Sequence, residues 1–417
     1  MRSAPLWLLA VMATGPVAAQ SAGDPNVEQA LAILQRDNAW TLEQQASLCQ
    51  IPAPPFKEAA RGAEYARRLQ ALGYQATIDQ VGNVIAVRTG TGGGKRLVLA
   101  AHLDTVFPEG TDVTVAIAGT KLTAPGIGDD CRGLAVVLAV ARAIQLAKVA
   151  TKGDLVLVAN VGEEGAGNLR GIRHLFDTKP MGPIEAFISV DGIGLGLISR
   201  AVGSNRYRVI FKGPGGHSFG DFGMPNPVHA MGRAIATIAD LRVPTSPRTT
   251  FNVGVIDGGT SVNSIAGTAT MQVDLRSESA EALAQVDTAF QRAVVKAVAD
   301  ERARWPGSKA PLTAEVQVIG KRAAGAQPDT SWIVTAAIQS ARQLGIPAPT
   351  PGAGSSDANV PIGLKIPALA IDGGGRGDGA HSLHEWYDDG DRGYLGPQWA
   401  LLLAVRLTGG SAGVPKP

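Results

Sequence analysis

The chain has 417 residues, of which 45% are hydrophobic and 18% are charged, a balance that excludes an intrinsically disordered protein. Its 38 basic and 36 acidic residues give a net charge of +2, which argues against a nucleic-acid footprint or a membrane-surface patch. A chain of this length should divide into about two domains and bury a large core. We therefore expect a small polar or amphipathic substrate, no nucleic-acid partner and no stable membrane association.

The first residues have the features of an export signal. Arg2 gives a positive start, residues 6–12 form a short apolar segment, and residues 17–19 (Val-Ala-Ala) offer small side chains to a signal peptidase. Gly15-Pro16 interrupts the apolar segment well short of the about 20 residues that span a bilayer, which argues against the alternative of a membrane anchor. We predict a signal peptide over residues 1–19, cleaved near Ala19, and an exported protein that is periplasmic or secreted.

Helical patterns alternate with short apolar runs between residue 27 and about residue 204. The helical patterns include residues 59–72 and 134–147, and the apolar runs are residues 97–101, 155–159 and 186–190. This alternation is typical of an α/β domain with a mostly parallel sheet covered by helices. It resumes late in the chain, with a predicted helix at residues 332–344 and a strand at residues 366–371.

The pattern is different between residues 205 and 321. The predicted order there is strand, helix, strand, strand, helix, strand, at residues 207–211, 227–241, 250–256, 268–275, 279–304 and 313–319. This βαββαβ order is that of a ferredoxin-like unit inserted into the larger domain. We predict a catalytic domain of residues 20–204 and 322–410, an inserted domain of residues 205–321 and a flexible tail at residues 411–417.

Polar residues follow the apolar runs where the strands should end. His102 and Asp104 follow the first run, and strand alternation places them on the same side, so the carboxylate can orient a metal-binding imidazole. Glu163 and Glu164 follow the second run, and adjacent acids normally repel each other. The pair makes sense if one acid binds a metal and the other accepts a proton from the attacking water.

Other acids and histidines extend this set. Asp129 lies in Gly-Ile-Gly-Asp-Asp before a predicted helix, where glycines allow close backbone approach and an Asp could bridge two cations. Asp191 follows the third run, and His381 and His384 follow a late glycine run. Each motif alone is usually a solvated loop. Residues beyond the carboxyl ends of strands in open α/β sheets converge in one crevice, however, so their joint occurrence predicts a metallohydrolase.

The ordered set, with a βαββαβ insertion before the last histidine, resembles the M20 family of dinuclear zinc peptidases and amidohydrolases. The resemblance covers nearly the whole mature chain and implies two divalent metal ions per subunit, zinc foremost, with cobalt or manganese possible. The implied ligands are His102, Asp129 and Asp191 for one ion and Asp129, Glu164 and His381 for the other. His381 is preferred to His384 because the family motif is a His followed closely by Glu and an aromatic, here Glu385-Trp386.

The same resemblance implies roles around the metals. Glu163 would be the general base, and Asp104 would be the partner of His102. The family also has a cis peptide bond after the bridging Asp, which would fall at Asp129–Asp130 and is rare for a non-proline bond.

The inserted domain carries a second resembling set. Residues 213–218 (Gly-Pro-Gly-Gly-His-Ser) resemble a lid segment whose His reaches the site of a neighbouring subunit. This implies a homodimer, a dimerisation and lid role for the inserted domain, and a catalytic role for His217. Asn263 and Arg276 match positions that bind polar groups or a terminal carboxylate of the substrate, and an Arg fork suits a carboxylate. A surface charge on an edge strand is the alternative for Arg276.

We therefore expect an exported metal-dependent hydrolase that cleaves amide bonds of short peptides, as an exopeptidase, or of N-acyl amino acids. One alternative is a serine α/β-hydrolase, because residues 216–220 satisfy G-x-S-x-G with Ser218 as nucleophile, although Gly223, Pro225 and Pro227 break the helix this motif needs. Another is a catalytically inactive binding protein on the same fold. The glycine run before Lys95 suggests a phosphate loop but precedes a strand, so we interpret it as a turn.

Cys49 and Cys131 are the only cysteines, too few for a disulfide framework. They could pair after export, but we interpret them as small packing residues. Cys131 lies close to Asp129, yet without a CxxC partner it is weak evidence for a zinc ligand.

Overall fold

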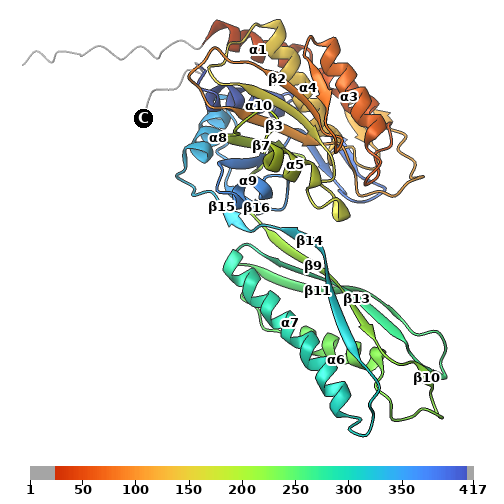
Figure 1. Ribbon diagram of the computed structural model, residues 1–417. Helices are drawn as coiled ribbons and strands as arrows, with labels where there is room; N and C mark the ends of the chain where they lie inside the picture. Colours follow the sequence, from red (N-terminus) through yellow and green to blue (C-terminus); the bar gives the residue numbers. More distant parts are fainter. Residues whose placement is uncertain (1–23, 411–417) are drawn as a thin grey trace, which may run out of the picture.

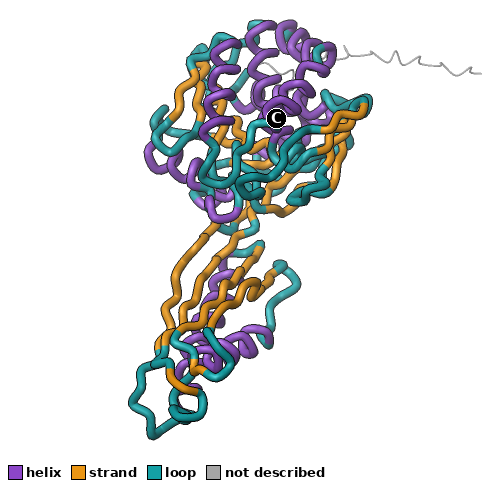
Figure 2. Tube along the Cα trace, turned by 90° about the vertical axis from the view of Figure 1, so that its right-hand side faces the viewer, coloured by secondary structure: helices purple, strands orange, loops and turns teal. Residues whose placement is uncertain are grey.

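The computed structural model describes residues 24–410, which form two bodies with separate sheets and separate cores (Figure 1). The larger body, here the main domain, contains a nine-stranded sheet. The smaller body, here the lid domain, contains a four-stranded sheet and projects from the main domain, joined to it by strands (Figure 2). The predicted signal peptide at residues 1–19 and the predicted tail at residues 411–417 lie outside the described residues.

The main sheet is parallel at its centre and antiparallel toward its edges. In spatial order its strands are β1 (Ala76–Ile78), β2 (Val84–Arg88), β6 (Leu155–Asn160), β3 (Leu97–His102), β7 (Ala186–Val190), β17 (Ala368–Ile371), β8 (Leu197–Ala201) and β15 (Gly325–Ala326), with β16 (Pro351–Gly354) also paired to β8. The four strands from β6 to β17 are parallel to one another. Every residue of β3, β6 and β7 is buried, as expected for continuous apolar runs covered on both faces.

Helices cover both faces of the main sheet. On one face pack α1 (Pro25–Arg36), α2 (Asn38–Cys49), α3 (Ala59–Ala71), α4 (Cys131–Leu146), α8 (Trp332–Gln343) and α10 (Leu395–Leu407), and on the other pack α5 (Arg170–Thr178) and α9 (Asn359–Gly363). Alternate residues of β3 serve the two cores: Leu97 and Leu99 face the first set and Val98 faces the second. Within the described residues, no helix has the length and hydropathy needed to cross a membrane.

The main domain also contains a small, four-stranded antiparallel sheet. Its strands are β18 (Arg376–Asp378), β19 (Trp386–Asp388), β5 (Lys121–Thr123) and β4 (Ala116–Ala118). Because β19 pairs with β5, the loop between β18 and β19 is brought against the segment that follows β5. His381 lies in the first of these segments and Asp129 in the second.

The lid domain has the predicted βαββαβ order. It consists of β9 (Gly203–Lys212), α6 (Pro227–Ala239), β11 (Thr249–Gly258), β13 (Thr268–Ser277), α7 (Ala280–Ala303) and β14 (Thr313–Arg322), with antiparallel sheet order β11-β13-β9-β14. Tyr207, Val209 and Phe211 alternate along β9 into a core shared with both helices. Short strands β10 (Gly216–His217) and β12 (Ser264–Ile265) pair near the end of the lid domain remote from the main domain (Figure 1). The predicted fold class is confirmed.

The interpretation of the cysteines as separate packing residues is wrong. Cys49, the last residue of α2, forms a disulfide with Cys131, the first residue of α4, and their Cα atoms are 5.5 Å apart. The two residues are 82 positions apart in sequence, and only the packing of α2 beside α4 brings them together. Because its sulfur is bonded to Cys49, Cys131 is not a metal ligand.

Candidate metal centre

The predicted ligands meet at the carboxyl edge of the three central strands. His102 is the last residue of β3, Glu163 and Glu164 lie in the loop after β6, and Asp191 directly follows β7. Because β6, β3 and β7 are parallel neighbours, their carboxyl ends lie side by side. His102, Glu163 and Glu164 are buried, so the sheet presents these groups in a largely water-excluded setting.

Asp129 lies between two imidazoles. Its Oδ1 is 2.9 Å from His102 Nε2, and its Oδ2 is 3.1 Å from His381 Nε2. His381 Nε2 is also 3.1 Å from Glu164 Oε1. Three groups have ligand atoms within 4.8 Å of one another: His102, Asp129 and Asp191; Asp129, Glu164 and His381; and His102, Glu163 and Glu164. The first two are the two predicted ligand sets, and they share Asp129.

The charges of this cluster fit divalent cations. Burial raises the pKa of Asp191, and the neighbouring Asp129 raises it further. Burial also opposes ionisation of Asp129, but hydrogen bonds from His102 and His381 hold its pKa well below the usual range. The hydrogen bonds to Asp129 and Glu164 raise the pKa of His381 to about 10. Once the two imidazoles have lost their protons, their nitrogens and the neighbouring carboxylates form a set of donors that suits metals such as zinc, cobalt or manganese.

Asp104 supports the site differently from the sequence-based prediction. His102 Nδ1 lies 3.0 Å from the backbone oxygen of Asp104, whereas the Asp104 carboxylate is 3.8 Å away. The carboxylate instead accepts the backbone N–H groups of Glu163 at 3.1 Å and Glu164 at 2.8 Å. The carboxylate is thus within ion-pair distance of His102 but makes no hydrogen bond to it: the backbone oxygen of Asp104 orients His102, and its fully buried side chain holds the next loop.

The sequence-based prediction did not include Glu385 among the site residues. Its buried carboxylate accepts the backbone N–H groups of Gly126 at 2.9 Å, Gly128 at 2.7 Å and Asp129 at 2.9 Å. Burial is the main cause that raises the pKa of Glu385 to about 7. The sequence showed Glu385 only as a neighbour of His381, with no sign that it holds the Asp129 segment. The Asp129–Asp130 peptide bond in this segment is cis, as the resemblance implied.

Arg322 was also missed, because it lies at the predicted boundary between the two domains. It is the last residue of β14, and its guanidinium donates to Glu163 Oε1 at 2.7 Å and to the backbone oxygen of Glu163. Burial raises the pKa of Glu163 to about 8, while the positive charge of Arg322 acts in the opposite direction. The lid domain therefore contributes a buried cation next to the metal-ligand cluster.

The predicted lid residues do not join the cluster within the described single chain. His217 lies in β10, near the remote end of the lid domain (Figure 1), and Asn263 accepts the Ser218 N–H at 2.9 Å through its backbone oxygen. Arg276 lies at the opposite end of the lid sheet, where it and Arg322 both pair with Ser204 of β9. Of the three, Arg276 is therefore the one that lies on the side of the main domain.

The geometry does not support a serine nucleophile. Ser218 follows a two-residue strand, and the next helix, α6, begins only at Pro227. A nucleophile elbow needs a strand that turns directly into a helix. The serine alternative therefore lacks its structural context.

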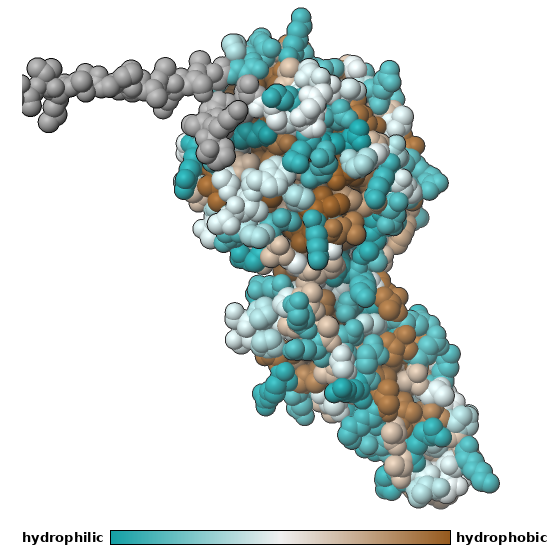
Figure 3. All heavy atoms as spheres, turned by 60° about the vertical axis from the view of Figure 1, so that its left-hand side comes forward, coloured by the Kyte–Doolittle hydropathy of each residue, from teal (hydrophilic) through white to brown (hydrophobic). Residues whose placement is uncertain are grey.

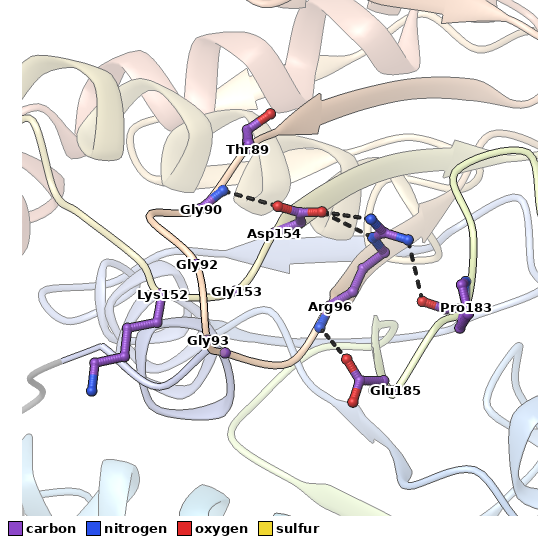
Figure 4. A pocket seen from close by; sticks show the side chains of 11 residues that line it. Thr89, Gly90, Gly92, Gly93, Arg96, Lys152, Gly153, Asp154, Pro183 and Glu185 are labelled. Atoms are coloured by element: carbon purple, nitrogen blue, oxygen red, sulfur yellow. Dashed lines mark hydrogen bonds and ion pairs between the residues drawn. The ribbon is translucent and has the colours of Figure 1, made fainter.

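The glycine run before Lys95 also lacks the context of a phosphate loop. It lines a pocket at the amino ends of β3 and β6, where the Arg96 guanidinium binds the Asp154 carboxylate and the Arg96 N–H donates to Glu185 (Figure 4). The chain continues from Arg96 into β3 and not into a helix, so the interpretation as a turn holds.

Known proteins are similar to this chain in sequence and in structure. Carboxypeptidase G2 of Pseudomonas sp. (strain RS-16) is 32% identical over 113 residues, which are 25% of this chain and 27% of that protein, so the match spans about a quarter of the relative's length. A tripeptidase of Staphylococcus aureus has a TM-score of 0.71 at 20% identity and covers 88% of this chain and 97% of its own. The Bacillus subtilis YXEP protein, described as a dinuclear metal-binding peptidase from the M20 family, has a TM-score of 0.64 at 18% identity and covers 90% and 98%.

The solved structures share the fold, and a family model extends the likeness to the site. The model described as peptidase family M20/M25/M40 matches residues 98–394, more than half of the chain. The matched region begins in β3 and contains both ligand sets, Glu163, the entire lid domain and Glu385. Membership implies a hydrolase that acts on amide bonds, and the described residues include clusters that could hold a metal ion. This chain therefore belongs to peptidase family M20/M25/M40.

Proposed function

We propose that this chain is an exported, metal-dependent hydrolase that removes terminal residues from short peptides or cleaves N-acyl amino acids. The observation that carries the proposal is the position of Asp129 between His102 and His381, with Glu164 and Asp191 completing two ligand sets that share it. The names of the similar tripeptidase and carboxypeptidase support small peptide substrates.

Five residues would hold the metals: His102, Asp129 and Asp191 one ion, and Asp129, Glu164 and His381 the other. Two bound ions, most simply zinc, would polarise the substrate carbonyl and lower the pKa of a water molecule. The backbone oxygen of Asp104 fixes the orientation of the His102 ring, and the Asp104 carboxylate fixes the backbone beside Glu164. These contacts place the ligands before any ion binds, which reduces the cost of assembling the site.

Glu163 is the proposed general base. Its carboxylate is buried beside the ligand cluster, and Arg322 holds its Oε1 at 2.7 Å. Burial favours a proton on this carboxylate, so Glu163 can accept the proton of the attacking water and then deliver it to the departing amine.

His217 is the proposed donor to the developing oxyanion, supplied by a second subunit. Its Nδ1 accepts the backbone N–H groups of Phe219 at 3.2 Å and Gly220 at 3.1 Å, which places the ring proton of a neutral imidazole on Nε2. The Nε2–H group can then donate to a carbonyl oxygen, an interaction worth several kcal/mol in comparable sites. Exposed Val255, Ile256 and Val318 of the lid strands, on a domain that carries hydrophobic surface (Figure 3), support a homodimer.

Arg276 and Asn263 are the proposed contacts for polar groups of the substrate. The Arg276 side chain is 39% exposed and pairs with Asp274 at 2.7 Å, so part of its guanidinium can still meet a carboxylate. Export is supported by the Cys49–Cys131 disulfide, because disulfides persist mainly in oxidising compartments.

The proposal is tested by measuring metal content together with hydrolysis of di- and tripeptides and N-acyl amino acids. We expect about two transition-metal ions per chain and activity that is lost on chelation. Glu163→Gln should retain the metals and lose turnover by at least about a thousandfold. Glu43→Gln, on the exposed side of α2, is the matched control and should behave like the wild type. An active metal-free protein that resists chelators would refute the proposal.

A further inference from the structure

The conformation of the loop that carries Glu163 depends on contacts with other segments of the chain. The base loop, defined here as residues 163–169, lies in the connection between β6 and α5 and contains a short 3-10 helix at Gly165–Gly167. It ends with Asn168 and Leu169, both in the left-handed region, at φ of 52° and 60°. Two consecutive non-glycine residues rarely adopt this conformation, so other contacts must hold the loop in place.

Strand β14, which leads from the lid domain back to the main domain, supplies some of these contacts. At the end of β14, the Lys321 N–H donates to Asn168 Oδ1 at 2.9 Å, and Arg173 donates to the backbone oxygen of Lys321. The next residue, Arg322, binds both the carboxylate and the backbone oxygen of Glu163. The base loop is therefore bonded at its first residue and near its end to two successive residues of one lid strand.

Strand β9, which leads from the main domain into the lid domain, contacts the same loop. Arg206 of β9 donates to the backbone oxygen of Gly165 at 3.1 Å and also pairs with Asp274 of β13 at 3.2 Å. The two lid strands that reach the main domain, β9 and β14, lie side by side in the lid sheet. Both are therefore tied to the segment that bears the proposed base and one proposed metal ligand.

The Arg322–Glu163 contact is the most buried of these links. Each side chain is only 6% exposed, and Arg322 also donates to Ser355 Oγ at 2.9 Å. Two donors of one guanidinium fix Glu163 from two directions, which a point charge could not do. Removing the guanidinium would leave the buried Glu163 carboxylate without its cation, which is unfavourable. We expect the Glu163 side chain to move or to form other contacts.

We propose that Arg322 is a positioning residue through which the lid domain holds Glu163 in its working place. Strand β14 has one irregularity in its pairing with β9, between Val318 and Gly320, and then pairs with β9 again up to Arg322. A rotation of the lid domain about its connecting strands therefore moves the guanidinium and, through it, the carboxylate. The orientation of the lid and the placement of the base are then linked directly. The catalytic part of this inference rests on the proposed function, whereas the mechanical link does not.

The kinetic test compares Arg322→Gln with Arg208→Gln in the full mature chain loaded with zinc. Arg208 is an exposed residue of β9 and serves as the matched control. Arg322→Gln should lower kcat about a hundredfold with little change in KM and with metal content unchanged, because a base displaced by about 1 Å acts poorly. Arg322→Lys should recover part of kcat, since it restores the charge without the fork. A raised KM with unchanged kcat would overturn the proposal and assign Arg322 to substrate binding.

Amide hydrogen exchange of residues 163–173 supplies a readout that needs no turnover. Exchange should be faster in Arg322→Gln than in Arg208→Gln or the wild type, because the link to β14 is lost. If the wild type hydrolyses no amide but its loop responds in this way, the proposed function fails and the mechanical link stands. Equal exchange in the three proteins would overturn the link. If Arg322→Gln does not fold, Arg322→Lys replaces it with the same expected direction.

Discussion

Asp104 is a buried residue that holds the backbone beside a proposed metal ligand, Glu164. Its carboxylate accepts two backbone N–H groups, at Glu163 and Glu164, and an Asn side chain could accept only one of them. We expect Asp104→Asn to weaken binding of the metal ion that Asp129, Glu164 and His381 are proposed to hold, by about ten- to a hundredfold. Calorimetric titration of the metal-free protein with zinc measures this change, and Asp391→Asn, at an exposed position, is the control. Equal affinities in the two variants would contradict the role assigned to Asp104.

As a proposed metal ligand, His381 should make metal binding depend on pH. Hydrogen bonds to Asp129 and Glu164 raise the pKa of His381 to about 10 in the metal-free protein, so a metal ion must displace its proton at neutral pH. Zinc affinity should therefore rise between about pH 6 and 9, with proton release detectable as a buffer-dependent binding enthalpy. A pH-independent affinity would be the contrary result.

The same shift affects the stability of the metal-free protein with a defined sign. Because the pKa of His381 is raised on folding, its contribution is fully present below the unfolded pKa of about 6.5. The contribution is lost as the pH rises through about 10. Thermal unfolding of the metal-free protein should show less stabilisation by His381, relative to His381→Ala, at high pH than at low pH.

Several site residues could not be predicted because their partners are remote in sequence. The side-chain types of His102, Asp129 and Glu164 indicate their chemistry. Their positions could also be read from the chain, because His102 and Glu164 follow apolar runs and Asp129 lies in a glycine-rich segment before a predicted helix. Glu385 contacts the Asp129 segment from more than 250 positions away. Arg322 contacts Glu163 from 159 positions away. No local pattern distinguishes such residues from surface charges.

At the level of elements, hydrophobic periodicity predicted most of the fold. The helix predicted at residues 279–304 is α7 (Ala280–Ala303), whose N-cap Ser279 accepts the Ala282 N–H. The run predicted at residues 186–190 is β7. The sequence pattern did not predict which strands pair. The antiparallel contacts of β2 with β6 and of β8 with β17 depend on the packing of the whole sheet. The pairing of Cys49 with Cys131 depends on helix packing in the same way.

The disulfide joins two helices at the edge of the metal centre. Cys131 begins α4, two residues after Asp129, and Cys49 ends α2, so the bond restrains the start of the helix that follows the metal-binding segment. Closing a chain segment of 82 residues should stabilise the fold by about 4.5 kcal/mol in the loop-entropy model. We expect the Cys49→Ser, Cys131→Ser double variant to lose about this much in urea unfolding of the metal-free protein.

A reductant control separates the disulfide from other effects of these substitutions. Reduction should lower the urea midpoint of the wild type toward that of the double variant and leave the double variant unchanged. A wild type whose midpoint does not respond to complete reduction would contradict the stabilising role.

At the scale of the whole molecule, the two proposed functions of the lid domain belong to its opposite ends. The end of its sheet next to the main domain carries Arg322 and Arg276, while the remote end carries His217 and the β10–β12 pair. A residue at the remote end lies away from the metal-ligand cluster of its own chain, which is why we propose that His217 serves the cluster of a second copy. The proposed dimer thus gives each active site a base from one subunit and an oxyanion donor from the other.

Mixed dimers test whether His217 of one subunit acts on the active site of the other. Glu163→Gln and His217→Ala should each be nearly inactive alone, since each subunit lacks either the base or the donor. If His217 acts across the dimer, a mixed dimer has one site with both groups intact and one site with neither. Random assortment of equal amounts makes half of the dimers mixed, so coexpression should restore roughly a quarter of wild-type activity. If His217 acts within its own chain, no site in any mixed dimer is intact and activity stays near zero, because every subunit carries one of the two substitutions.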